Sequence, residues 1–149
     1  MTQEAQFLIF EMTRINVGIE PGCLLDELLL AELREIKRLP WFKRNCKNQN
    51  SPTNFTLGKG HIKFFLPRLR YAKLRYERLK EEAEIRGFRV TDFSTNFSGI
   101  DLGEWWEPVE NDREIIIERI TERVKASRKR YWHYYGKRVT AEEVIKRIS

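Results

Sequence analysis

Apolar residues recur at helical spacing in three stretches of the chain, and the first stretch lies between Gly22 and Pro40. Its repeat places on one face the aliphatic residues Leu25, Leu28, Leu29, Leu33 and Ile36. Positions three and four residues apart share a face of an α-helix, so this stretch predicts an amphipathic helix. Pro40 would stop the helix or start a turn, because the residue before a proline disfavours the helical conformation.

The second stretch begins near Pro67, which suits the first turn of a helix, and ends before Gly87. Its predicted buried face consists of Leu69, Ala72, Tyr76, Leu79 and Ala83. Gly87 suits the position just past a helix end, where Phe88 can pack back on the last turn. The other face is expected to be solvated, with DNA contact as the alternative, and carries Arg70, Lys73, Arg75, Arg78 and Lys80.

The third stretch has the apolar residues Ile116, Ile117, Ile120 and Val124, with Asn111 or Asp112 as its N-cap. Thr140-x-x-Glu143 resembles a capping box that opens a short last helix. Residues 43–60 and 91–110 are polar or irregular and predict loops, and no strand pair with a clear hairpin turn stands out. The sequence therefore predicts an all-α fold, a compact single domain of three main helices with long loops and a short extra C-terminal helix.

Length and composition are those of one folded domain. The chain has 149 residues, of which 41% are hydrophobic and 34% charged, so it should fold rather than stay disordered. A formal net charge of +6 favours an anionic partner, nucleic acid first and anionic membrane second. A basic protein without a polyanionic partner is the alternative.

Several classes of protein are disfavoured. No apolar run reaches the roughly 20 residues that span a bilayer, and no secretory signal is apparent, so we expect no membrane partner and a cytoplasmic location. Cys23 and Cys46 form no Cys-x-x-Cys pair, which fits a reduced intracellular protein. His61 and His133 have no metal-ligand spacing, so we expect no metal site.

Residues 130–138 form a run in which four aromatic residues, Tyr131, Trp132, Tyr134 and Tyr135, lie between cations. Such a run suits stacking on nucleic-acid bases and pairing with phosphates, and the alternative is that the rings pack into the core. Gly136 beside Lys137 indicates a sharp turn. Gly58-Lys59-Gly60 lacks the spacing of a nucleotide-binding loop, so a structural turn is the favoured interpretation.

Four short motifs occur in one order along the chain: MTRIN at 12–16, AELRE at 31–35, LGKGHIKFF at 57–65 and WHYYGK at 132–137. Together they resemble the pyrimidine-dimer DNA glycosylases of the T-even phage endonuclease V type. The resemblance covers Met12 to Arg138. It divides the chain into an N-terminal extension (1–11), a glycosylase domain (12–138) and a C-terminal extension (139–149).

The resemblance implies a monomeric DNA-repair enzyme that excises ultraviolet pyrimidine dimers from double-stranded DNA and then cleaves the abasic site by β-elimination. The nucleophile would be the α-amino group of Thr13, exposed when Met12 is removed, and the essential carboxylate would be Glu35. The family match also implies DNA-binding roles for Arg14, Arg34, Arg38, Arg119, Arg123, Tyr131, Trp132, Tyr134, Tyr135 and Lys137. No metal or organic cofactor is required by this scheme.

An α-amino group suits this chemistry because its pKa of about 7.7–8.0 leaves a useful fraction uncharged at neutral pH, unlike a lysine near 10.4. Cations such as Arg14 and Arg34 would lower that pKa further. Glu35 would stabilise positive charge on the sugar and move protons. Glu32, inside the apolar stripe, is expected to form an internal ion pair with a buried arginine.

The sequence departs from the family pattern in several places, including extra residues at both ends. Asp26-Glu27-Leu28 stands where the family has a histidine, and Tyr131-Trp132 has the swapped order. If translation starts at Met1, Thr13 lies within the chain and has no free amine, although Met1-Thr2 could yield a terminal threonine elsewhere. A non-catalytic DNA-binding protein is therefore the alternative, and a nuclease for another lesion or for RNA is a third hypothesis.

Overall fold

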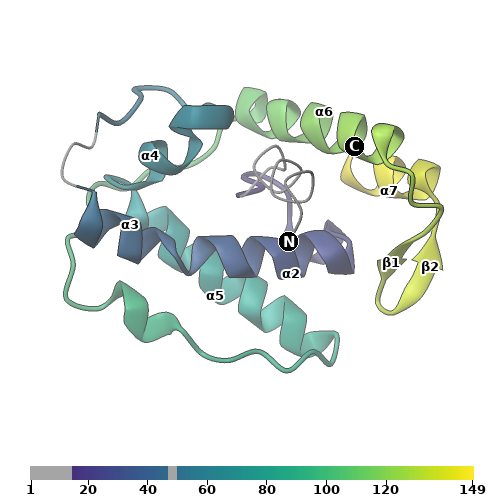
Figure 1. Cartoon of the computed structure of the whole chain (residues 1–149), viewed down its shortest axis with the longest axis horizontal. Coiled ribbons are helices and arrows are strands. Elements are labelled where there is room, and N and C mark those ends of the chain that lie inside the picture. The colour runs from purple at the N-terminus through teal and green to yellow at the C-terminus, as the bar shows by residue number, and fades with distance from the viewer. Residues whose placement is uncertain (1–14, 47–49) are drawn as a thin grey trace.

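A computed structural model of the chain describes residues 15–46 and 50–149. Its elements are mostly helical, with one small antiparallel hairpin (Figure 1). In chain order they are η1 (Pro21–Cys23), α2 (Asp26–Ile36), α3 (Leu39–Asn45), η2 (Gly58–Gly60), α4 (His61–Phe65), α5 (Leu69–Ile85), η3 (Ser94–Phe97), α6 (Glu110–Ala126), β1 (Trp132–Tyr134), β2 (Lys137–Val139) and α7 (Ala141–Ile148).

The core forms where α2 packs on α5, with α6 and α7 packed together beside them (Figure 1). All five aliphatic residues of the first predicted stripe are buried, and so are all five residues predicted for the second. In α6, Ile116, Ile120 and Val124 are buried in the same cluster, while Ile117 is partly buried. The apolar periodicity therefore identified the three long helices and the side that each turns to the core.

None of the helices in the described part of the chain combines the length and apolar character needed to cross a membrane.

The C-terminal end of α5 has the predicted glycine stop. Gly87 has a positive φ of 88°, which a residue with a side chain rarely adopts. The Phe88 N–H donates to the Ala83 carbonyl at 3.0 Å, and the Gly87 N–H donates to the Glu84 carbonyl at 2.9 Å. These two bonds satisfy carbonyls that the helix end leaves open.

One residue of α5 is not where the sequence placed it. Arg75 was expected on the solvated face, and that prediction is wrong, because its side chain is only 7% exposed. The physical reason is its position three residues after Ala72 and four before Leu79, which puts it on the buried face of the helix.

The prediction of a purely helical fold is also wrong, because β1 and β2 form an antiparallel hairpin with Trp132 opposite Val139. The turn residues Tyr135 and Gly136 both have positive φ, 52° and 75°, as a type I′ turn requires. The sequence did not predict this hairpin because Tyr135 occupies the first turn position, where asparagine or aspartate is the usual signal.

The helix caps agree with the sequence in one case and differ in another. Thr140 caps α7, and its hydroxyl accepts the Glu143 N–H at 3.3 Å, as predicted. Neither predicted residue caps α6, whose N-cap is Val109. Asp112 instead occupies the third helical position and accepts the Val109 N–H at 2.9 Å. An aspartate can satisfy an open N–H from this position as well as from the cap itself.

Residues 139–149, expected as an extension, pack into the same core. Val139, Val144 and Ile148 are all buried, and α7 lies against α6. Another helix, α3, runs through Asn45 into the stretch expected to be a loop. Pro40 falls in its first turn, where a missing N–H costs nothing.

Candidate functional site

The chain segment that follows the proposed nucleophile is fixed between α2 and α4. Thr13 and Arg14 themselves lie outside the described residues. The next residue, Ile15, donates its backbone N–H to His61 Nε2 at 3.0 Å. The side-chain amide of Asn16 donates to Glu32 Oε1 at 2.9 Å, and both Ile15 and Asn16 are buried. Two side chains from separate helices therefore hold the chain immediately after Arg14.

His61 was not assigned a role from the sequence, yet it anchors this segment. A backbone N–H can only donate, so Nε2 of His61 must carry no proton. Nδ1 lies 3.0 Å from the Thr56 carbonyl and is therefore the protonated, donating nitrogen. The ring is neutral and held as one tautomer. A lone buried histidine carries no spacing signal, but the order of the MTRIN and LGKGHIKFF motifs could have pointed to this contact.

Glu32 forms the internal ion pair predicted for it, and its partner is Arg75. Arg75 Nε donates to Glu32 Oε2 at 2.6 Å, and Arg75 Nη2 donates to Glu32 Oε1 at 3.1 Å. The third nitrogen, Nη1, donates to the Ile19 carbonyl at 2.8 Å. Burial alone would lower the pKa of Arg75, but the adjacent Glu32 carboxylate more than offsets this and raises it. The pair fixes residues 16–19 against α2 and α5.

Glu35 lies one turn beyond Glu32 on α2 and has different surroundings. Its side chain is 17% exposed. Within the described part of the chain, its Oε2 atom is buried and has no hydrogen-bond partner. Arg38 forms a long ion pair with it, with Nη1 at 3.9 Å from Oε2. A buried carboxylate oxygen without a partner is uncommon in stable structural sites, and such groups are enriched where a substrate or ligand completes the site.

The arginines expected at the DNA lie on two helices. Arg34 and Arg38 flank Glu35 on and just after α2, and both are exposed. Arg119 and Arg123 lie one turn apart on α6 and are partly buried. Helix spacing alone brings Arg38 close to Glu35, at 3.9 Å, and one turn from Arg34, whereas the α6 pair comes from a distant part of the sequence.

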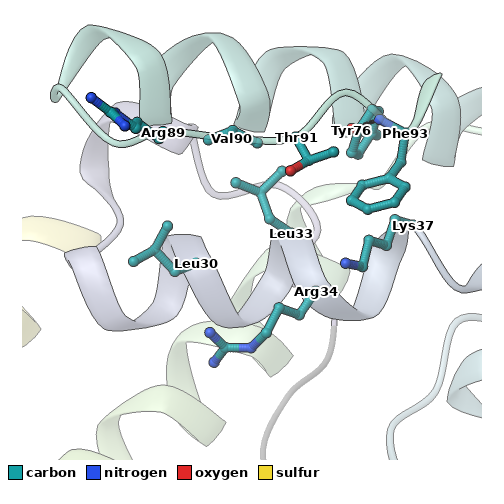
Figure 2. A pocket seen from close by; sticks show the side chains of 9 residues that line it. All are labelled: Leu30, Leu33, Arg34, Lys37, Tyr76, Arg89, Val90, Thr91 and Phe93. Atoms are coloured by element: carbon teal, nitrogen blue, oxygen red, sulfur yellow. Dashed lines mark hydrogen bonds between the residues drawn. The ribbon is translucent and has the colours of Figure 1, made fainter.

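A pocket of about 200 Å³ lies on a different side of α2, between that helix and residues 89–93 (Figure 2). Leu30, Leu33 and Lys37 line it from α2, and the Lys37 ammonium lies 4.1 Å from the centre of the Phe93 ring. Leu33 and Glu35 are two positions apart, which turns them to nearly opposite sides of the helix. Glu35 does not line the pocket, but Arg34, its neighbour in the chain, does.

The aromatic run lies at the other end of α2 from Glu35. The backbone N–H of His133 donates to the Glu27 carboxylate at 2.8 Å, and the N–H groups of Tyr135 and Gly136 donate to Asp26. Because a helix rises about 1.5 Å per residue, Asp26 at the start of α2 and Glu35 are about 13.5 Å apart along its axis. Figure 1 shows the hairpin and α3 at opposite ends of α2.

The four aromatic residues of the run differ in exposure. Trp132 is buried in the core, and Tyr134 is half-buried with its hydroxyl donating to the Gly22 carbonyl at 2.6 Å. Tyr131 and Tyr135 are exposed, as is Lys137. The hydroxyl of Tyr135 donates to Glu82 at 2.5 Å. The run therefore divides into rings that hold the hairpin on the core and rings that face outward.

A comparison of the chain with models of known protein families finds no match. Among residues 15–46 and 50–149, no three histidine, cysteine, aspartate or glutamate side chains gather closely enough to hold a metal ion. The chemistry available around Glu35 is that of a carboxylate with an open oxygen, flanking arginines and a firmly anchored chain segment.

Proposed function

We propose that this protein is a DNA glycosylase and abasic-site lyase that excises pyrimidine dimers from damaged double-stranded DNA. The α-amino group of Thr13 is the nucleophile, and Glu35 is the carboxylate that assists it. The observation that supports this function best is the buried Oε2 of Glu35, which has no hydrogen-bond partner in the described residues. It lies one helical turn from the point where the chain after Thr13 is anchored.

Chain connectivity supports this pairing. Thr13 precedes the anchored Ile15 by two residues, and two residues of extended chain span at most about 7 Å. The Asn16 side chain is hydrogen-bonded to Glu32, and Glu35 lies three residues further along α2, a rise of about 4.5 Å. These lengths are short enough to allow an amine at Thr13 to reach the open carboxylate.

The proposed reaction starts when the amine nitrogen attacks C1′ of the damaged nucleotide. The bond from C1′ to the base breaks, and the base leaves with the electron pair and takes a proton. The nitrogen loses a proton, the sugar ring opens with protonation of its oxygen, and an iminium link forms. Removal of a proton from C2′ then breaks the C3′–oxygen bond, and the phosphate leaves with the electron pair. Glu35 stabilises the positive charge and carries protons in these steps.

The charge of the hairpin end supports binding to DNA. Residues 125–139 contain basic side chains and no aspartate or glutamate. All six of these cations are exposed: Lys125, Arg128, Lys129, Arg130, Lys137 and Arg138. Contacts with phosphates supply much of the affinity of proteins for duplex DNA. The proposal includes a cytoplasmic location, with the nucleoid as the source of the DNA substrate.

Borohydride trapping tests this function directly. A chain that begins at Thr13 is mixed with duplex DNA containing a pyrimidine dimer or an abasic site, and borohydride reduces any iminium to a stable bond. We expect a covalent protein–DNA adduct with this chain and none with the same chain carrying Met12 in place. Glu35→Gln should bind DNA but lose turnover. Absence of an adduct with a free Thr13 amine would exclude the proposed chemistry.

The second candidate is a DNA-binding protein without glycosylase activity. It is favoured by the basic hairpin end, whose charge does not depend on whether Thr13 has a free amine. Intact-mass measurement of the protein made in its native cell separates the two candidates. A terminus at Thr13 supports the enzyme, and a terminus at residue 1 or 2 supports the binding protein.

A further inference from the structure

The short helix α3 presents an aromatic and basic surface that the proposed function has not used. Trp41 is 58% exposed, next to Phe42, and the helix sequence LPWFKRN contains no aspartate or glutamate. Single exposed apolar residues are common on protein surfaces. A tryptophan beside a second ring and two cations is instead typical of surfaces that bind single-stranded or distorted nucleic acid.

A series of side-chain contacts joins this surface to Glu35. Arg38 lies 3.9 Å from the Glu35 carboxylate, and its guanidinium carbon lies 5.6 Å from the centre of the Phe42 ring. The Phe42 and Trp41 rings meet edge to face with their centres 5.2 Å apart. The exposed indole is therefore two side chains away from the proposed catalytic carboxylate.

The helix that carries Trp41 is firmly held. Its first two residues, Leu39 and Pro40, are buried. Arg44 on its last turn donates to the carbonyls of Asn96 and Ser98 at 2.9 and 3.0 Å. These contacts fix the helix that carries the indole, so less conformational entropy is lost when a ligand binds to it.

Trp41 differs from Trp105, the other strongly exposed tryptophan among the described residues, in the charge of its surroundings. Trp105 is 50% exposed, but it is flanked by the exposed carboxylates of Glu104 and Glu107. Trp41 is flanked by Arg38, Lys43 and Arg44. A polyanion is attracted to the surroundings of Trp41 and repelled by those of Trp105.

We propose that Trp41 stacks on a nucleotide base next to the damaged site, while the cations of α3 lie along the neighbouring phosphates. In an intact duplex every base is covered by its neighbours, so a ring can stack only where the duplex stack is interrupted. Trp41 therefore favours interrupted over continuous DNA. This inference rests on the proposed function, because it takes damaged DNA as the ligand near Glu35.

The test measures binding of the full chain to two duplexes of equal length by fluorescence anisotropy. One duplex contains a tetrahydrofuran abasic analogue, which cannot form an iminium, and the other is intact. Loss of one stacked base lowers affinity by a factor of roughly 5 to 150. We expect Trp41→Ala to lose affinity in this range for the abasic duplex and to change little for the intact one. Trp41→Phe should keep most of the affinity, and Trp105→Ala should match the unchanged protein.

Equal affinities of Trp41→Ala and the unchanged protein for the abasic duplex would overturn the stacking inference, as would an equal loss with Trp105→Ala. The proposed chemistry is judged separately, by borohydride trapping of the chain that begins at Thr13. An adduct without a Trp41 effect rejects the stacking alone. A Trp41 effect without an adduct rejects the glycosylase chemistry and keeps the stacking surface.

Discussion

Glu32 and Glu35 lie one turn apart on α2, yet their carboxylates are engaged very differently. Both oxygens of Glu32 are hydrogen-bonded, to Arg75 and Asn16, and its side chain is fully buried. The buried oxygen of Glu35 has no such partner among the described residues. A carboxylate whose hydrogen bonds are all satisfied within the protein stabilises the fold. One with an unsatisfied oxygen can accept a hydrogen bond from a substrate. This difference supports the proposal that Glu32 holds the structure and Glu35 takes part in the chemistry.

The Glu32–Arg75 pair gives a prediction about stability. Arg75→Met should lower the free energy of unfolding by about 3–5 kcal/mol, because it leaves the Glu32 carboxylate buried without its cation. Urea denaturation measures this change. Lys80→Met removes the partly exposed Lys80–Glu84 pair on the same helix and should cost less than about 1 kcal/mol. Similar losses in the two variants would contradict a structural role for Arg75.

Tyr71 gives a prediction about pH. Burial raises the pKa of its hydroxyl above the ordinary value of 10.0, with the nearby Arg75 acting in the opposite direction. Folding therefore favours the protonated phenol. Its contribution to stability is complete below about pH 10 and is lost as the pH rises through the folded-state pKa. Urea denaturation between about pH 9 and pH 11 should show a smaller alkaline loss in Tyr71→Phe than in the unchanged protein. Parallel curves for the two proteins would rule this out.

At the scale of elements, the length of each repeat decides how well the sequence predicts it. The stripes of α2, α5 and α6 each extend over several turns, so a 3.6-residue period is unambiguous. The strands of the hairpin have three residues each, too few for an alternating pattern to stand out. The five-residue α4 is missed for the same reason, although it carries His61. Short elements are fixed by tertiary contacts that local sequence does not contain.

The junction between α5 and the stretch before α6 depends on Gly103. Its φ is +71°, and an added Cβ would lie 1.9 Å from the Pro67 carbonyl oxygen. Gly99 has nearly the same φ of +72° but open space around it. Gly99→Ala should cost about 1–2 kcal/mol from backbone strain. Gly103→Ala should cost roughly 1–3 kcal/mol more from the clash, as measured by urea denaturation. Equal costs would mean that Gly103 is constrained by conformation alone.

For the molecule as a whole, part of the candidate site could be predicted from the sequence and part could not. Helix spacing places Arg38 near Glu35, because residues three or four apart share a face. No local pattern reveals that the aromatic run lies at the opposite end of α2, since hydrogen bonds to Asp26 and Glu27 hold the hairpin there. The same holds for the contact between Ile15 and His61, which are 46 positions apart.

The distribution of charge gives the last prediction, about salt. Lys137 is exposed in the basic stretch of the hairpin end, where it would pair with a phosphate rather than with a base. A phosphate contact carries no sequence or damage information. Lys137→Ala should therefore weaken binding to intact and damaged duplexes by the same factor. The slope of log affinity against log salt concentration should become shallower by about 0.9.

Lys80 provides the matched control, because it is also a lysine but lies on α5 paired with Glu84. Lys80→Ala should leave both the affinity and the salt slope unchanged. If Lys137→Ala leaves the slope unchanged as well, the hairpin end does not contact DNA, and the duplex must be bound from the α3 end of α2. If Lys137→Ala affects only the damaged duplex, Lys137 acts at the lesion itself. DNA contact can thus be tested separately at the two ends of α2: by the salt slope at the hairpin end and by the stacking of Trp41 at the α3 end.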